Sequence, residues 1–448
     1  MQSTESFSKS CGPGASPASY LLIVLTCVVV IRGVAADDNP PVALTDQASA
    51  EADALRTEQY EIANRLIERY PDDFESLRIL GFVHSCHGNF DEMRRCWLKC
   101  VQLQPQRVDV LDQLAKQAAK VEQYDEALDY WQRAQDIDED DPGLSQQIGD
   151  TLLKLGRAAE ARQQLQQAVQ ANPQDTQSVY LLGEACYRMR DYDAARENYL
   201  KVTRLAPTHA QAYYGLMRTY AQLKQPDEAN RCADQFRKLE SAAAEADRQF
   251  RQQFNDLTQM QTNLAHTCID AGRVYLRNKA DWNDSEKLWK RALELSPQFS
   301  MPRSLLAALY IQQQKNTNAL AQYLELAKLE PNVLDHQQRI GFLQASVGNL
   351  KGAEAAMERI IALAPNDSTG YRSLCKLYLN SKQQPARALQ LAQRAVQLDP
   401  AADSYFVLGW ARAVNGQRQG ALEALQQATK LDPDNATYRQ LFELVRKN

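Results

Sequence analysis

The sequence is poor in the residues and motifs from which catalytic and metal sites are commonly built. It has five histidines in 448 residues, and it has no CxxC, CxxCH, HExxH or GxSxG motif and no glycine-rich phosphate loop. His209, His266 and His336 stand alone near the starts of expected helices, where surface or capping roles are typical. The sequence therefore has none of the common motifs of hydrolases, of phosphate-binding proteins or of zinc-binding proteins. We therefore predict no catalytic, cofactor-binding or metal-binding residues.

The chain also lacks a surplus of either charge. Its 51 basic and 56 acidic residues are interspersed and give a formal net charge of −5. Nucleic-acid binding usually needs a basic patch or tail, so we expect protein partners and no nucleic acid. The content of 44% hydrophobic and 24% charged residues is typical of a folded protein. A chain this long exceeds one hydrophobic core, so several domains or an extended repeat are expected.

One apolar run, YLLIVLTCVVVI at residues 20–31, stands out near the N-terminus. It follows a polar leader and precedes small residues ahead of Asp37, which is the outline of an export signal. As a helix it would reach roughly 18 Å, short of the roughly 30 Å apolar layer of a bilayer. We predict that residues 1–36 are a signal peptide, or alternatively an uncleaved N-terminal anchor, and that residues 37–48 are a linker. The protein is then exported, periplasmic or extracellular, or it is anchored to a membrane by this segment.

A period of 34 residues organises the rest of the chain. Small or flexible residues recur at this spacing: Met93, Ala127, Ala161, Ala195 and Ala229. Large residues recur four positions later: Trp97, Trp131, Leu165 and Tyr199. A third column is small, with one exception at the end: Gly81, Ala115, Gly149, Gly183 and Met217. Prolines punctuate the ends of units: Pro71, Pro105, Pro173 and Pro207.

Each column predicts a role in a pair of helices. The glycine or alanine column lies on a first helix, where a missing side chain lets a second helix approach closely. The small residue and the large residue four positions later share one face of that second helix. Proline ends the unit because it cannot continue a helix but suits the first turn of the next.

These residues resemble the tetratricopeptide repeat, a degenerate 34-residue helix–turn–helix. The stretch AVQANPQDTQSVYLLGEACYRMRDYDAARENYLKVTRLAP matches its pattern almost throughout. The resemblance implies an all-α, right-handed solenoid of about ten full repeats, of the kind found in exported bacterial-type multi-repeat proteins. It implies a binding surface and no particular activity.

The repeat frame divides the chain into segments. A first array spans residues 49–240 and begins with a partial unit, and a second array spans residues 265–433. Residues 434–448 read as a capping helix, which a solenoid needs to cover its last apolar face.

The insertion between the arrays, residues 241–264, has no glycine or proline and reads as one long helix. Apolar residues follow a three-and-four spacing along it and form a seam: Ala243, Ala246, Phe250, Leu257, Met260 and Leu264. The seam either packs on neighbouring repeats or forms a homodimer contact; we favour packing, because two heptads are short for an independent coiled coil.

Residues 82–100, FVHSCHGNFDEMRRCWLKC, hold three cysteines and two histidines. The repeat frame places them at core positions, where unpaired cysteine packs as a small hydrophobe. Two alternatives stay open. One is a disulfide such as Cys86–Cys96, and the other is a metal site whose ligands have helical spacing: His84, His87, Cys96 and Cys100.

The resemblance also implies a concave groove lined by the first helices. Its lining positions correspond to these residues: Tyr180, Glu184, Tyr187, Arg188, Tyr214, Arg218, Arg273, Arg277, Arg339, Phe342, Phe406 and Trp410. Aromatic residues and arginines often dominate the binding energy of interfaces. The clamp by which some family members hold a terminal carboxylate is missing as a set, with Arg372 and Lys376 as a fragment of it.

The sequence therefore predicts a non-catalytic scaffold that binds a peptide or a partner protein in the groove, outside the cytoplasm. One alternative is an assembly or secretion factor anchored in the cell envelope, with membrane contact only if the leader is uncleaved. Another is a metal or redox protein that uses the cysteines and histidines.

Overall fold

The computed structural model describes residues 46–253, 256–278 and 282–447. The predicted signal peptide or anchor, residues 1–36, and all but the last residues of the predicted linker, 37–48, lie outside these ranges. Within them, every regular element is a helix. No helix in the described part of the chain has both the length and the apolar character needed to cross a membrane.

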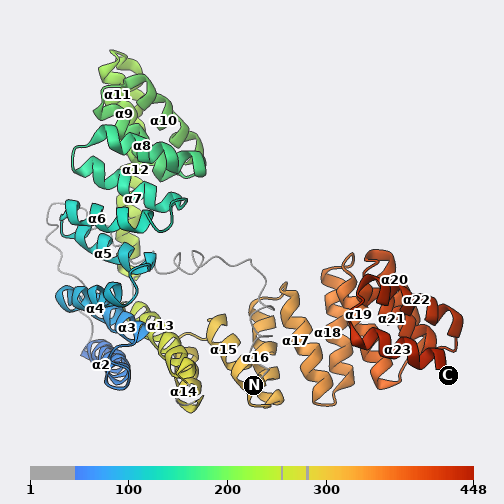
Figure 1. Ribbon diagram of the computed structural model, residues 1–448. Coiled ribbons are helices and arrows are strands. Elements are labelled where there is room, and N and C mark those ends of the chain that lie inside the picture. The colour runs from blue at the N-terminus through green and yellow to red at the C-terminus, as the bar shows by residue number, and fades with distance from the viewer. Residues whose placement is uncertain (1–45, 254–255, 279–281, 448) are drawn as a thin grey trace. The chain divides into compact units, whose positions relative to one another are not determined.

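The helices follow one another as α2 (Asp46–Arg69), α3 (Phe74–Cys86), α4 (Phe90–Leu103), α5 (Val108–Lys120), α6 (Tyr124–Gln135), α7 (Pro142–Lys154), α8 (Ala158–Ala171), α9 (Thr176–Arg188), α10 (Tyr192–Leu205), α11 (Ala210–Gln222), α12 (Pro226–Gln253), α13 (Asp256–Arg277), α14 (Trp282–Leu295), α15 (Ser300–Gln312), α16 (Asn316–Leu329), α17 (Leu334–Ser346), α18 (Leu350–Leu363), α19 (Ser368–Ser381), α20 (Pro385–Leu398), α21 (Ala402–Val414), α22 (Arg418–Leu431) and α23 (Ala436–Lys447) (Figure 1). From α3 onward they pack in consecutive pairs, and most pairs stack on the pair before. The predicted all-α repeat fold is confirmed.

The turn inside each pair shows the 34-residue period in the backbone itself. Each described turn inside a pair has a residue of positive φ, between 54° and 81°, at one repeat position, in two evenly spaced series: Gly88, Glu122, Gly156, Arg190 and Lys224, then Gln314, Gly348, Lys382 and Gly416. The turn at Lys382 has a second such residue, Gln384, with a φ of 45°. Glycine adopts this conformation at little cost, whereas other residues are strained by it. The turn geometry is therefore maintained even where the sequence does not supply glycine.

The two helices of a pair approach closely because a glycine faces a large side chain. A Cβ atom added to Gly81 would lie 2.3 Å from the Trp97 ring, and one added to Gly272 would lie 2.4 Å from the Trp289 ring. Both distances are shorter than any real contact, so the small-residue column is a steric requirement. The predicted role of that column is thus the observed one.

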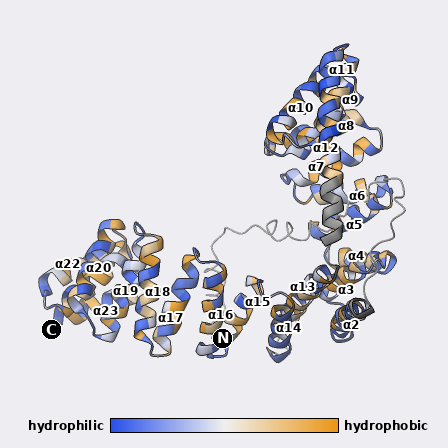
Figure 2. Cartoon of the chain, turned by 180° about the vertical axis from the view of Figure 1, so that it is seen from behind, coloured by the Kyte–Doolittle hydropathy of each residue, from blue (hydrophilic) through white to orange (hydrophobic). Residues whose placement is uncertain are grey.

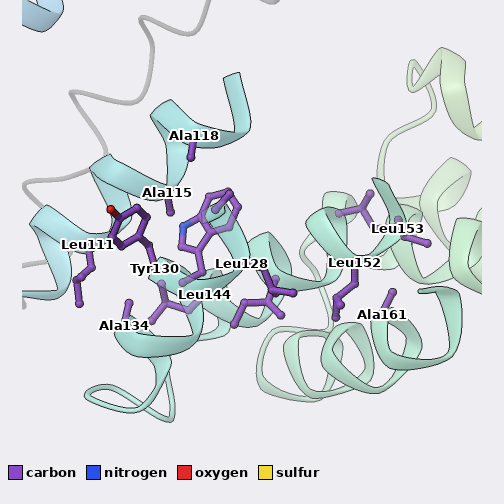
Figure 3. Packing of buried hydrophobic residues seen from close by; sticks show 14 of the residues in the cluster. Leu111, Ala115, Ala118, Leu128, Tyr130, Ala134, Leu144, Leu152, Leu153 and Ala161 are labelled. Carbon is purple, nitrogen blue, oxygen red and sulfur yellow. The ribbon is translucent and has the colours of Figure 1, made fainter. Parts of the chain in front are cut away.

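Apolar side chains from successive pairs form continuous cores. In Figure 3, Leu111 and Ala115 of α5, Tyr130 of α6 and Leu144 of α7 lie within one such cluster, and all four are buried. Apolar residues lie along one side of most helices and hydrophilic residues along the other (Figure 2). Burial of one face per helix is what the period of the sequence predicts.

A contact between distant parts of the sequence forms at the first helices. Residues of α2 and α3 share a core with residues of α13 and α14, including Leu66, Ile79, Leu264 and Ala292. Charged groups surround this core: Arg78 Nη2 lies 2.7 Å from Asp270 Oδ2. The partial unit formed by α2 is therefore completed by helices that follow about 200 residues later.

The described part of the insertion belongs to two helices. α12 has 28 residues and ends at Gln253, and α13 begins at Asp256. Residues 254–255 lie outside the described ranges, so a single helix through 241–264 stays a prediction. Leu264 is buried, and Leu257 and Met260 pack against the core of α2, α3 and α13, so this half of the apolar seam is a packing surface.

Candidate functional site

Glu184 of α9 is the centre of a polar network on the first array. Its carboxylate accepts hydrogen bonds from the Tyr199 hydroxyl at 2.9 Å, from Arg218 Nη2 at 2.7 Å and from Arg188 Nε at 3.4 Å. The repeat places these groups together because positions 34 residues apart lie side by side on neighbouring first helices, as Glu184 and Arg218 do. Neither arginine has another carboxylate partner among the ion pairs of the described chain. Two positive charges thus share one negative charge.

Arg218 is held between two tyrosine rings. Its guanidinium carbon lies 4.5 Å from the centroid of the Tyr187 ring and 4.8 Å from that of the Tyr214 ring. Burial alone would lower the pKa of Arg218, but the neighbouring Glu184 carboxylate outweighs this effect and raises it. The cation is therefore permanent, oriented and in contact with aromatic faces.

The edge of this group is accessible to a partner. Tyr214 is 40% exposed, Arg188 is exposed and Tyr187 is half-buried. Beside Tyr187 and Arg218 lies an open pocket of about 330 Å³, whose other walls come from α11 and α12. Of the twelve predicted groove residues, the structure thus brings Glu184, Tyr187, Arg188, Tyr214 and Arg218 together. We call these five residues the tyrosine–arginine site.

The other predicted groove residues lie elsewhere. Tyr180 is half-buried between the rings of Tyr199 and His209. Arg273 lies 3.5 Å from Asp270, and Arg277 pairs with Asp73 at the start of α3.

The predicted groove residues of the second array differ in their exposure and in their partners. Arg339 pairs with Asp335 at 3.6 Å on its own helix, and the Phe342 ring is 66% exposed. Phe406 is buried, 4.8 Å from the Tyr438 ring of the last helix, and Trp410 lies half-buried beside it. Phe406 thus packs against α23 and is not exposed, so it offers a partner little surface.

The two cations that form the fragment of a carboxylate clamp already lie near aspartates of the same chain. Arg372 lies 3.8 Å from Asp399 and 3.9 Å from Asp403, and Lys376 lies 3.5 Å from Asp403. A terminal carboxylate would have to compete with these aspartates, so this pair is a poor receptor for one.

The histidines and cysteines of residues 82–100 point to separate partners. His84 Nδ1 lies 3.3 Å from the Tyr60 hydroxyl, and His87 Nε2 lies 2.8 Å from Gln59 Oε1. Cys100 is fully buried, with Sγ 3.6 Å from the Phe74 carbonyl oxygen.

The seven cysteines in the described ranges form no disulfide with one another. In the same ranges, no group of three or more His, Cys, Asp or Glu side chains is arranged to hold a metal ion. The partners of His84, His87 and Cys100 agree with the packing interpretation of this cluster.

Buried thiols make stability sensitive to alkali. Burial raises the pKa values of Cys100, Cys268 and Cys375 to about 12. An unfolded thiol ionises near pH 8.5, so each contribution is complete below that pH and is lost as pH rises toward 12. We expect each thiol to cost about 1.4 kcal/mol of unfolding free energy per pH unit in this interval.

Urea unfolding of the wild type and of Cys375→Ala, measured between pH 8 and 11, tests this expectation. Above about pH 8.5, the unfolding free energy of the variant should fall with pH by about 1.4 kcal/mol per pH unit less than that of the wild type, because one buried thiol is missing. Equal slopes for the two proteins would contradict it.

The structure also reveals pocket residues that the groove pattern missed. Gln222, Ala229, Asn230 and Ala233 line the pocket together with Met217. The sequence carried one signal for them, since Met217 breaks the small-residue column.

Comparisons with known proteins place these features in a family. Profiles described as tetratricopeptide repeat match residues 147–210, 187–230 and 402–435. The human protein O-mannosyl-transferase TMTC3 is 27% identical over 247 residues, which is 50% of this chain and 27% of that protein. Cellulose synthase operon protein C of Pseudomonas fluorescens (strain SBW25) is 27% identical over 207 residues, 46% of this chain and 15% of that protein. The chain thus spans about a quarter or less of these two relatives.

Among solved structures, YrrB is described as a TPR protein with an unusual peptide-binding site. It is 22% identical, with a TM-score of 0.36, and the match covers 40% of this chain and 91% of that one. The sequence period, the glycine contacts inside each helix pair and the matching profiles agree. The chain thus contains tetratricopeptide repeats, over the residues that these profiles match.

Proposed function

We propose that this protein is a non-catalytic scaffold that holds an extended, acidic segment of a partner protein across α9 and α11. The observation that carries the proposal is the position of Arg218, a permanent cation between two tyrosine rings at an accessible edge. Tetratricopeptide repeats provide surfaces for other proteins, and this site is the part of the predicted groove where five candidate residues converge.

The charge of the site supports an acidic ligand. Arg188 and Arg218 share the single carboxylate of Glu184, so one positive charge is left to attract a partner's Asp or Glu. Charge-assisted hydrogen bonds from arginine to carboxylate are short and directional. The exposed ring of Tyr214 offers apolar contact beside that charge.

The site is also organised before binding. Arg218 is fixed by Glu184 and by the two rings, and Tyr214 in turn lies 5.3 Å from the Phe236 ring of α12. A side chain that is already ordered loses little entropy when a ligand arrives. This supports recognition of an extended segment at a modest cost.

The paired variant Tyr187→Ala with Tyr214→Ala tests the proposal. Truncating two interface aromatics should weaken capture of a carboxylate-bearing partner about 10- to 100-fold while leaving helical content and melting unchanged. Binding can be measured by fluorescence polarisation against an array of acidic extended peptides, and by pull-down of partners. Phe342→Ala, which truncates an exposed aromatic of the second array, is the matched control.

Equal binding by the paired variant and by the wild type would refute the assignment of this site. Weakening by Phe342→Ala instead would move the binding surface to the second array.

As part of the same proposal, the scaffold acts outside the cytoplasm, either cleaved or held by residues 1–36 as an envelope-anchored assembly or secretion factor. Sequencing of the mature N-terminus separates the two forms. A start near Asp37 removes the anchor, and retention of the leader establishes it.

A further inference from the structure

The last helix pair of the first array leaves a surface uncovered that the other full pairs bury. In general, the first helix of the next pair packs against the two helices of a pair and covers the V-shaped angle between them. Examples are α7 on α6, α9 on α8, α11 on α10 and α17 on α16. At the end of the second array, α23 packs against α22 and α21 in the same way. Among the helix pairs that share several contacts in the described chain, α12 pairs only with α11.

The reason lies in the contact between distant parts of the chain. α13 follows α12 in sequence and carries the glycine–tryptophan pair of a normal first helix, Gly272 with Trp289. It packs on α3 instead. The V between α11 and α12 is thereby left without its usual occupant.

Equivalent side chains of α10 and α12 differ in burial, because α11 covers α10 and no helix of the described chain covers α12 in this way. Ala195, Tyr199 and Val202 of α10 are fully buried beneath α11. The residues one period later on α12, Ala229, Ala233 and Phe236, are only half-buried.

The sequence shapes this surface into a hollow. In the preceding pair, Gly183 of the first helix faces Tyr199 of the second. In the last pair the sizes are exchanged, with Met217 on the first helix and Ala233 on the second. Both residues line the open pocket of about 330 Å³. We define the open seat as Met217, Gln222, Ala229, Asn230 and Ala233.

We propose that the open seat binds an amphipathic helix of a partner protein, about 13 residues long, with a small residue near its N-terminus and a carboxylate in its middle. The length follows from the helices that cover the other pairs, such as α9 and α11, each of 13 residues. The occupant is a helix because a helix fills this position elsewhere in the chain. This partner helix and the extended segment proposed above share Arg218 and Tyr187, which line the pocket, and the five residues of the open seat belong to the helix alone.

The small residue follows from the way α11 covers α10. Ala212 of α11 packs with Val202, and Gly215 lies so close to Tyr199 that an added Cβ would be 2.6 Å from the ring. A helix that covers α12 therefore needs a small residue at the position of Ala212, whereas Ala233, which stands in place of Tyr199, leaves room for a larger residue at the position of Gly215.

The carboxylate follows from the position of Arg218. Arg218 reaches across to Glu184 of α9, the residue at the same repeat position one period earlier. A helix in the open seat would have a residue at the same repeat position as Glu184 and Arg218. That residue would lie beside Arg218, on the side away from Glu184, where Arg218 lines the pocket. The two arginines that share Glu184 leave a positive charge there, so a carboxylate is the complementary group.

A peptide of this chain supplies the probe. Residues 174–191 contain α9, with Ser178 at the position of Ala212, Leu181 at the position of Gly215 and the carboxylate Glu184 at the position of Arg218. We expect the fluorescein-labelled peptide, under reducing conditions, to bind the full protein saturably. Ala233→Arg or Asn230→Arg in the protein should weaken this binding at least tenfold, because a long charged side chain would fill the pocket. Asn230 is exposed, so its replacement should leave folding intact, which circular dichroism checks.

Two controls separate this site from the tyrosine–arginine site. Tyr214→Ala, outside the pocket, should change helix binding much less than Asn230→Arg does, while it weakens binding of acidic extended peptides. A probe with Glu184→Gln should bind several-fold more weakly to the wild-type protein.

Three results would overturn the proposal. They are an absence of saturable binding, equal binding by Asn230→Arg and the wild type, and a concentration-dependent dimer that Ala233→Arg dissociates. The last would assign the open seat to a second copy of this chain.

Discussion

Replacing Trp289 by alanine is expected to lower the unfolding free energy of the pair α13–α14 by about 3–5 kcal/mol. The Trp289 side chain is fully buried, and its Nε1 donates a hydrogen bond to the Ile269 carbonyl oxygen at 3.1 Å. Truncation would open a cavity against Gly272 and remove the hydrogen bond from the side chain to that carbonyl. Because Gly272 has no side chain, the opposing helix cannot fill the space.

Trp282→Ala is a matched control, since Trp282 lies on the same helix and is 41% exposed. It should cost well under 1 kcal/mol. Urea unfolding followed by circular dichroism, together with hydrogen exchange resolved to α13 and α14, measures both variants. Similar losses for the two tryptophans would show that Trp289 does not hold the pair together.

Replacing Arg78 by alanine is expected to weaken the docking of α13 on α3 by about 2–3 kcal/mol. Arg78 bridges two carboxylates, with Nε 2.6 Å from Glu75 and Nη2 2.7 Å from Asp270. Its removal would leave both carboxylates partly buried and without their shared cation. Breaking a buried pair costs about 3–5 kcal/mol. We expect less here, because each of the three side chains keeps a quarter to a third of its surface exposed.

The thiol of Cys268 reports this docking, because it is fully buried in the core shared by α2, α3 and α13. Thiol labelling of Cys268 in Arg78→Ala should be about 30- to 150-fold faster, which is 2–3 kcal/mol expressed as a change in opening. Labelling of Cys375, buried in the second array, should not change.

Two further variants test the cause. Exchanging the charges, Arg78→Asp with Asp270→Arg, should restore part of the protection. Arg95→Ala removes an exposed pair with Glu92 and should have no effect. Unchanged labelling of Cys268 in Arg78→Ala would mean that apolar contacts alone hold the two helices together.

The candidate site illustrates the limits of the repeat frame. The frame placed Tyr187, Tyr214 and Arg218 on the first helices, and the structure brings them together because equivalent positions lie side by side. It placed Phe406 there as well, yet α23 covers that ring. Whether a groove position is open depends on which helix comes next, and a single repeat does not contain that information.

The sequence by itself determined the helices, their pairing and the contacts inside each pair. These depend on residues at most about 34 positions apart, and each recurring column carries its own steric reason, as Gly81 against Trp97 shows. Only the tertiary structure decided where α13 packs and so which surface stays uncovered. That choice depends on an apolar core and ion pairs between residues about 200 positions apart, such as Arg78 and Asp270, and no period links them.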